Sequence, residues 1–206
     1  MVNKKFQKAY TMVEMLTVVA IIMILSAIFV SLNQPQKKFA LQRNIYSLSA
    51  AARSVQEMSM SISTIKINNI DRVPEGGYGI QLSSETQENK NKNYILYFNN
   101  LADSGNLTYQ SGEAVLNSPI NFTDNVAISG ISGTSELGEA ISDITQLNII
   151  YYPPDPKILI FYNQDSGSTL KDATVTLKLG GTNFVRKIYF NKLGLISVDQ
   201  KQETEP

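Results

Sequence analysis

The sequence predicts an α+β fold, in which a long N-terminal helix packs on an antiparallel β-sheet domain. Two observations predict it. Apolar residues run almost unbroken from Met15 to Leu32 and then recur every three or four positions as far as Ile62, which is helical spacing. From Lys66 onward, short β-prone runs alternate with turns rich in Gly, Asn, Asp, Ser and Pro. A helix followed only by strands implies an antiparallel sheet packed on that helix.

The first element is an apolar segment long enough to span a bilayer. Residues 15–36 contain no charged side chain, and residues 15–32 alone could cross the hydrocarbon core as a helix. Lys4, Lys5 and Lys8 precede the segment, so the positive-inside rule keeps the N-terminus in the cytoplasm and exports the rest of the chain. Three kinds of segment fit this pattern: an ordinary anchor, a cleaved secretory signal and a pilin-type signal.

Two features separate these alternatives. A secretory signal ends its short apolar region at a small-residue cleavage site, whereas this long run ends in the polar residues 33–36. An ordinary anchor explains the length but not Glu14, a carboxylate at the start of the run. An acid within a membrane costs about 2.5–3.5 kcal/mol at the helix centre and less near its end, so it usually marks function.

Residues 9–16, Ala-Tyr-Thr-Met-Val-Glu-Met-Leu, resemble the class III signal of type IV pilins and pseudopilins. In that family, a prepilin peptidase cuts after a small residue and the new N-terminal residue is N-methylated. The resemblance implies cleavage between Ala9 and Tyr10, N-methylation of Tyr10, and a role for Glu14 in assembly. Ala9 and Tyr10 replace the glycine and phenylalanine that the family prefers, and both replacements are chemically close.

The position of Glu14 suggests how it would act in a filament. Cleavage creates a positive amine on Tyr10, and Glu14 of a neighbouring subunit could pair with it. Two buried charges would then partly compensate each other and set the axial register between subunits. The alternative is that Glu14 lies at the cytoplasmic interface and extends into water.

The helix is expected to continue beyond the membrane, over residues 10–63 in all. Residues 10–32 form the transmembrane part and residues 37–63 an amphipathic part, with Pro35 between them as a kink or as the break between two separate helices. The amphipathic stripe consists of Leu41, Ile45, Leu48, Ala52, Val55, Met58 and Ile62.

Residues 64–206 are expected to form an exported β-rich domain, with a disordered tail over about residues 200–206. The predicted strands are residues 78–82, 94–98, 120–122, 126–131, 147–152, 158–162, 173–179, 184–190 and 195–198. Gly180 and Gly181 connect two of them as a C-terminal hairpin. The entry Pro-Glu-Gly-Gly-Tyr-Gly-Ile at residues 74–80 resembles that of H-type (GspH/FimT-like) minor pseudopilins.

Composition limits the chemistry that the chain can perform. It has neither cysteine nor histidine, so thiolate chemistry and the commonest general base and metal ligand are excluded. We therefore expect no enzyme activity, no cofactor and no metal site, and interpret the oxygen-rich runs 103–106 and 163–167 as surface turns. Without Lys4, Lys5 and Lys8 the chain has 15 basic against 18 acidic residues, a balance that does not attract nucleic acid.

One basic cluster nevertheless supports an alternative function. Lys178, Arg186, Lys187 and Lys192 lie close together in sequence around the predicted hairpin. FimT-like minor pilins can bind DNA through a basic C-terminal region, so the resemblance implies a DNA-binding minor pilin as the rival. Against it, Arg186 and Lys187 point to opposite faces of a strand, and an acidic tail follows.

The sequence therefore predicts a minor pilin or pseudopilin, a structural subunit of a type IV pilus-like or type II secretion filament. The resemblance implies four partners: other pilins or pseudopilins, a prepilin peptidase, an inner-membrane assembly platform and the membrane itself. The expected location is the inner membrane, with the domain exported, and later a periplasmic or extracellular filament.

Overall fold

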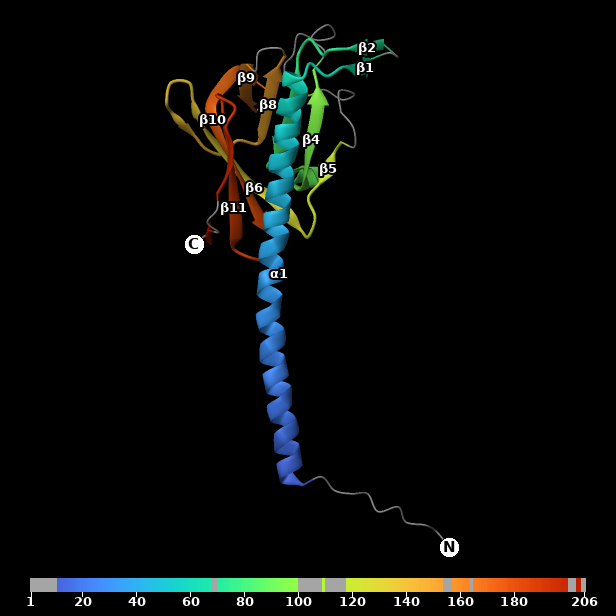
Figure 1. Ribbon diagram of the computed structural model, residues 1–206. Helices are drawn as coiled ribbons and strands as arrows, with labels where there is room; N and C mark the ends of the chain where they lie inside the picture. The colour runs from blue at the N-terminus through green and yellow to red at the C-terminus, as the bar shows by residue number, and fades with distance from the viewer. Residues whose placement is uncertain are drawn as a thin grey trace. The chain divides into compact units, whose positions relative to one another are not determined.

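The computed structural model describes residues 11–67, 70–99, 109, 118–153, 157–163, 165–199 and 203–204 of the chain. The chain divides into two compact units, Met1–Phe39 and Ala40–Pro206. Helix α1, Met12–Met60, contributes to both units and includes Pro35 (Figure 1). The amphipathic part of the helix thus belongs to the same compact unit as the strands.

The first unit contains the apolar part of α1. Met12–Phe29 is long and apolar enough to cross a membrane, and none of it is buried by the protein. The two hydroxyls in its interior bond to the backbone of their own helix: Thr17 Oγ1 donates to the carbonyl of Glu14 at 2.8 Å and Ser26 Oγ to that of Ile22 at 2.7 Å. Polar groups satisfied within the helix suit a medium without water.

In the second unit, α1 buries a narrow apolar stripe. Five of the seven predicted stripe residues are at most 2% exposed: Leu41, Ile45, Leu48, Ala52 and Val55. Met58 packs partly buried against them. The prediction that Ile62 belongs to the stripe is wrong. The helix ends at Met60, and Ile62 is half exposed in a left-handed conformation (φ 50°).

The strands confirm the predicted α+β class. Strand bounds are β1 Ile65–Ile67, β2 Ile70–Arg72, β3 Tyr78–Ser83, β4 Asn93–Phe98, β5 Ile120–Asn121, β6 Val126–Ser135, β7 Ala140–Ile141, β8 Gln146–Tyr152, β9 Lys157–Tyr162, β10 Asp165–Leu179, β11 Phe184–Asn191, β12 Ile196–Val198 and β13 Glu203–Thr204. A 3₁₀ segment, η1, covers Gln87–Lys92. Every strand pair is antiparallel.

Strand β10 joins two sheets. The first sheet has the order β5-β4-β3-β8-β9 and ends on the beginning of β10. The second sheet contains β7, β6, the rest of β10, β11 and then β12 and β13 along the outer edge of β11. The predicted C-terminal hairpin is confirmed, with Val175 opposite Ile188 and a turn through Gly180 and Gly181. β1 and β2 form a separate two-stranded ribbon.

Both sheets bury one face against α1. In the first sheet the inward residues alternate along each strand, as Ile80 and Leu82 in β3 and Leu147 and Ile149 in β8 do. In the second sheet Val175, Leu177 and Ile188 complete the same core. The outward face of the first sheet has a smaller core of its own, formed by Tyr97, Ile150 and Phe161.

Four short strands were not predicted: β1, β2, β7 and β13. Strands β6 and β10 are also longer than predicted, because β6 continues to Ser135 and β10 begins at Asp165. The expectation of a disordered tail is contradicted at two residues, since Glu203 and Thr204 pair with Val185 and Phe184 of β11.

Candidate functional site

The first turn of α1 is closed by two reciprocal hydrogen bonds between Thr11 and Glu14. Thr11 precedes the helix, and its Oγ1 accepts from the backbone N–H of Glu14 at 3.3 Å. Glu14 Oε2 in turn accepts from the backbone N–H of Thr11 at 2.9 Å and from the Thr11 hydroxyl at 3.0 Å. This is a capping box, in which a Thr-x-x-Glu sequence satisfies helix N–H groups that have no partner within the helix.

The capping box gives Glu14 a role that the sequence analysis missed, although the Thr-x-x-Glu spacing signals it directly. A carboxylate at this position is also favoured by the positive end of the helix dipole. Of the two carboxylate oxygens of Glu14, Oε2 accepts both of these hydrogen bonds, and Oε1 has no hydrogen-bond partner within the described residues. The side chain can therefore stabilise its own helix and accept from a second donor.

The helix that follows Glu14 presents apolar side chains on all sides. Every residue from 11 to 29 is exposed in this unit. The large apolar side chains among them are 45–86% exposed. Such a continuous apolar surface is rare on a soluble monomer and indicates lipid or another protein as its medium.

The predicted cleavage residues Ala9 and Tyr10 lie outside the described residues, as do Lys4, Lys5 and Lys8. The run 103–106 also lies outside them. Among the described residues, no group of three or more acidic side chains could hold a metal ion.

The four basic residues do not form one cluster. Lys178 lies opposite Val185 and Lys187 opposite Thr176, so both lysines project from the same face of the second sheet. Arg186 projects from the other face and donates to the carbonyl of Asp199 at 2.8 Å. Lys192, in the turn after β11, pairs with Glu136 at 2.8 Å.

Comparison with known proteins gives one match. Residues 4–30 match the prokaryotic N-terminal methylation motif. No curated protein and no solved structure matches the chain. The chain thus carries a prepilin-like signal on the segment that contains Glu14 and the exposed apolar helix, which supports a pilin-type precursor anchored in a membrane.

Proposed function

We propose that this chain is the precursor of a minor pilin or pseudopilin, a structural subunit of a type IV pilus-like or type II secretion filament. The observation that carries the proposal is the methylation motif at residues 4–30, which overlaps the fully exposed apolar part of α1. Such a subunit needs a prepilin signal, an apolar helix and a separate β-rich unit, and this chain contains all three.

Processing would begin at the membrane. The basic residues Lys4, Lys5 and Lys8 hold the N-terminus in the cytoplasm, and a prepilin peptidase cuts between Ala9 and Tyr10. Tyr10 is then N-methylated. The unit Ala40–Pro206 is exported, and the apolar helices of successive subunits pack together when the assembly platform extracts them from the membrane.

Glu14 would act as the pairing group between subunits. Its Oε1 accepts from the Tyr10 amine of a neighbouring subunit, while its Oε2 keeps the bonds to Thr11 of its own chain. A charge left unpaired in such an apolar surrounding is strongly unfavourable, and pairing reduces the cost of both charges. The capping box also fixes the rotamer of Glu14, so the carboxylate is already positioned before assembly.

Processing is tested with the full-length protein and a prepilin peptidase in the same cells. We expect intact mass spectrometry to show loss of the nine-residue leader and one methyl group on Tyr10. An uncut protein in the native host would contradict the proposal.

Three substitutions separate the charge of Glu14 from its capping role. Glu14→Gln retains the capping box, which accepts either residue, but removes the charge. Glu14→Leu removes both, and Thr11→Ala removes the cap and leaves the charge. We expect both Glu14 variants to be cut, to insert in the membrane, and to be lost from sheared filaments or from complexes with partner pilins. Thr11→Ala should still assemble. Normal assembly of Glu14→Gln would contradict the ion pair.

We do not extend the proposal to DNA binding, which stays a prediction. Lys178 and Lys187 share a face, but Arg186 lies on the other face and Lys192 is paired with an acid. A duplex-DNA shift by the full chain that weakens steeply with salt would favour that rival.

A further inference from the structure

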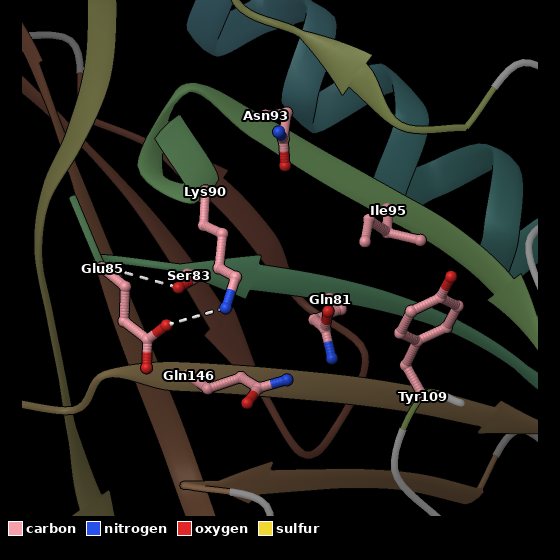
Figure 2. Close-up of a pocket in the computed structure, with 8 residues that line it drawn as sticks. All are labelled: Gln81, Ser83, Glu85, Lys90, Asn93, Ile95, Tyr109 and Gln146. Atoms are coloured by element: carbon pink, nitrogen blue, oxygen red, sulfur yellow. Dashed lines mark hydrogen bonds and ion pairs between the residues drawn. The ribbon is translucent and has the colours of Figure 1, made fainter. Parts of the chain in front are cut away.

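The outward face of the first sheet holds a pocket that the filament proposal does not use. Its volume is about 320 Å³, and it is lined by Gln81, Ser83, Glu85, Lys90, Asn93, Ile95, Tyr109 and Gln146. Figure 2 shows Lys90 and Glu85 at one end, Tyr109 and Ile95 at the other, and the side chains of Gln81 and Gln146 between them. The volume is in the range of small-molecule sites, about 300–1,000 Å³.

The pocket follows from the register of three adjacent strands, β8, β3 and β4. One row across them is Asn148, Gln81 and Ile95, and the next places Gln146 opposite Ser83. Because directly paired residues project from the same face, carboxamides and a hydroxyl from distant parts of the sequence meet at one point. Six residues of β3 and β8 pair in one continuous register without a bulge.

Several of these polar groups lack a hydrogen-bond partner. Gln81 is only 9% exposed and donates to Asn148 Oδ1 at 3.1 Å, yet its Oε1 has no partner within the described residues. The Asn148 amide nitrogen is fully buried and also lacks one in that part of the chain. The side-chain amides of Asn93 and Gln146 make no hydrogen bond to described residues either. Gln81 and Asn148 are buried, and buried unpaired polar groups are rare in native proteins and call for an explanation such as a ligand. Asn93 and Gln146 are half-buried, so their amides are open to a ligand or to water.

The pocket carries no unpaired charge on its lining. Glu85 and Lys90 are the charged residues of the lining, and they pair with each other at 3.4 Å. The pocket therefore offers neither a strong anion site nor a strong cation site. A neutral ligand with many hydrogen-bonding groups fits this lining best.

An aromatic wall completes the pocket. The ring of Tyr109 packs edge to face on Tyr97, with centroids 5.5 Å apart. Tyr97 lies over Gly79, where an added Cβ would fall 2.4 Å from the Tyr97 ring. Only glycine leaves room for that ring, so β3 supports the aromatic wall beside the polar rows.

We propose that this pocket binds a neutral hexopyranose, as a residue of a glycan. Sugar hydroxyls both donate and accept, and carboxamides offer both kinds of group in return. The C–H face of a pyranose ring would pack on the ring of Tyr109, while its hydroxyls bond to Gln81, Asn93 and Gln146. This inference is independent of the filament proposal, because it rests only on residues of the unit Ala40–Pro206.

The test uses the full-length protein in a phosphocholine detergent, because maltoside and glucoside detergents are themselves sugars. The probes are the methyl glycosides of glucose, galactose, mannose and N-acetylglucosamine at millimolar concentration, with inorganic phosphate as the charged comparison. Saturation-transfer NMR reports binding, and the side-chain NH₂ signals of the glutamines and asparagines report where it occurs. We expect at least one sugar to bind and to shift the signals of Gln81 and Gln146.

Variants of residues that line the pocket test whether the sugar binds there. Gln146→Ala and Asn93→Ala each remove one hydrogen-bonding group, so each should weaken sugar binding about three- to tenfold. Gln87→Ala is the matched control, because Gln87 lies on η1 and does not line the pocket. Thermal melting of each variant shows whether it is folded. The proposal is wrong if no sugar binds, if phosphate binds in place of the sugars, or if folded Gln146→Ala and Asn93→Ala both bind as the wild-type protein does.

Discussion

The two parts of helix α1 use apolar residues in different ways. From residue 11 to residue 29 every side chain is exposed, and the hydrogen bonds of its polar side chains are to neighbouring turns of the helix. From Leu41 to Val55 one stripe is fully buried in the core of both sheets, and the exposed side is mixed, with Arg43, Tyr46, Ser47, Ala50 and Arg53 on it. The difference shows that the arrangement of apolar residues, and not their number, indicates whether a helix is covered by its own protein.

The largest expected effect on stability comes from replacing a buried leucine of α1 by alanine. The same replacement in the exposed apolar part is the control. Leu48→Ala removes a fully buried side chain and leaves a cavity, so it should destabilise the domain by about 3 kcal/mol. Leu25→Ala removes a side chain that is 59% exposed and should change domain stability by less than about 0.5 kcal/mol. Thermal melting in detergent, followed by near-ultraviolet circular dichroism, should shift by about 6–12 °C for Leu48→Ala alone. Equal shifts would contradict the division into two units.

The same contrast explains what the sequence could predict. The stripe from Leu41 to Met58 and the hairpin of β10 and β11 have strong local periodicity, and both are confirmed. The end of the helix was predicted too late because it is a Schellman motif: Ser63 N–H donates to the Met58 carbonyl at 3.1 Å and Ile62 N–H to that of Ser59 at 3.3 Å. Isoleucine rarely adopts the left-handed conformation that this motif needs, so no stop signal was visible.

The strands that were missed have two or three residues each, too few for an alternating pattern.

The candidate sites also differ in how far local sequence can reveal them. The methylation motif and the Thr-x-x-Glu box are local in sequence, so both can be recognised from sequence. The pocket depends on the register of β8 against β3 and β4, which brings Gln146 to Ser83 across more than sixty positions, and no local pattern contains that register.

A second prediction concerns a buried polar side chain in the covered part of α1. Asn44 is almost fully buried on α1, where Oδ1 accepts from Thr123 N–H at 2.9 Å and Nδ2 donates to the Ala40 carbonyl at 2.8 Å. Asn44→Ala leaves the Thr123 N–H without that partner and should cost about 2 kcal/mol in the free energy of unfolding.

The neighbouring Arg43 is the control for Asn44. Its ion pair with Asp124 is 2.6 Å long, but its side chain is 65% exposed, so Arg43→Ala should cost only about 0.5 kcal/mol. Chemical denaturation of the two variants gives both values. A larger loss for Arg43→Ala would show that the exposed ion pair, and not the buried amide, holds the turn at Thr123 against the helix.

Alkaline pH should also distinguish the two parts. Burial raises the pKa of Tyr151 and of Tyr78 above the usual value for tyrosine. Below about pH 10 both folded and unfolded states keep the proton, whereas above it the unfolded state loses protons first, so stability falls as pH rises. The loss approaches about 1.4 kcal/mol per pH unit for one such tyrosine.

The apolar part of α1 provides the contrast, because residues 11–29 contain no tyrosine. Far-ultraviolet circular dichroism in micelles should show that its helix persists at a pH where the domain has unfolded. Tyr151→Phe should reduce the slope of domain stability above pH 10. An unchanged slope would mean that Tyr151 ionises as easily in the folded state as in the unfolded one.

The most local expected effect is at the start of α1, where Thr11→Ala removes the hydroxyl that accepts from Glu14 N–H. Losing an N-cap costs about 1 kcal/mol, and here the cost falls on the first turn alone because residues 11–29 are all exposed. Amide exchange of Glu14 and Met15 in micelles should become about fivefold faster, while domain melting stays unchanged. Thr17→Ala is the matched control, because its hydroxyl only donates to the Glu14 carbonyl and caps nothing. Equal exchange in the two variants would mean that the reciprocal bonds of Thr11 and Glu14 do not hold the first turn, and that Glu14 is not positioned before assembly.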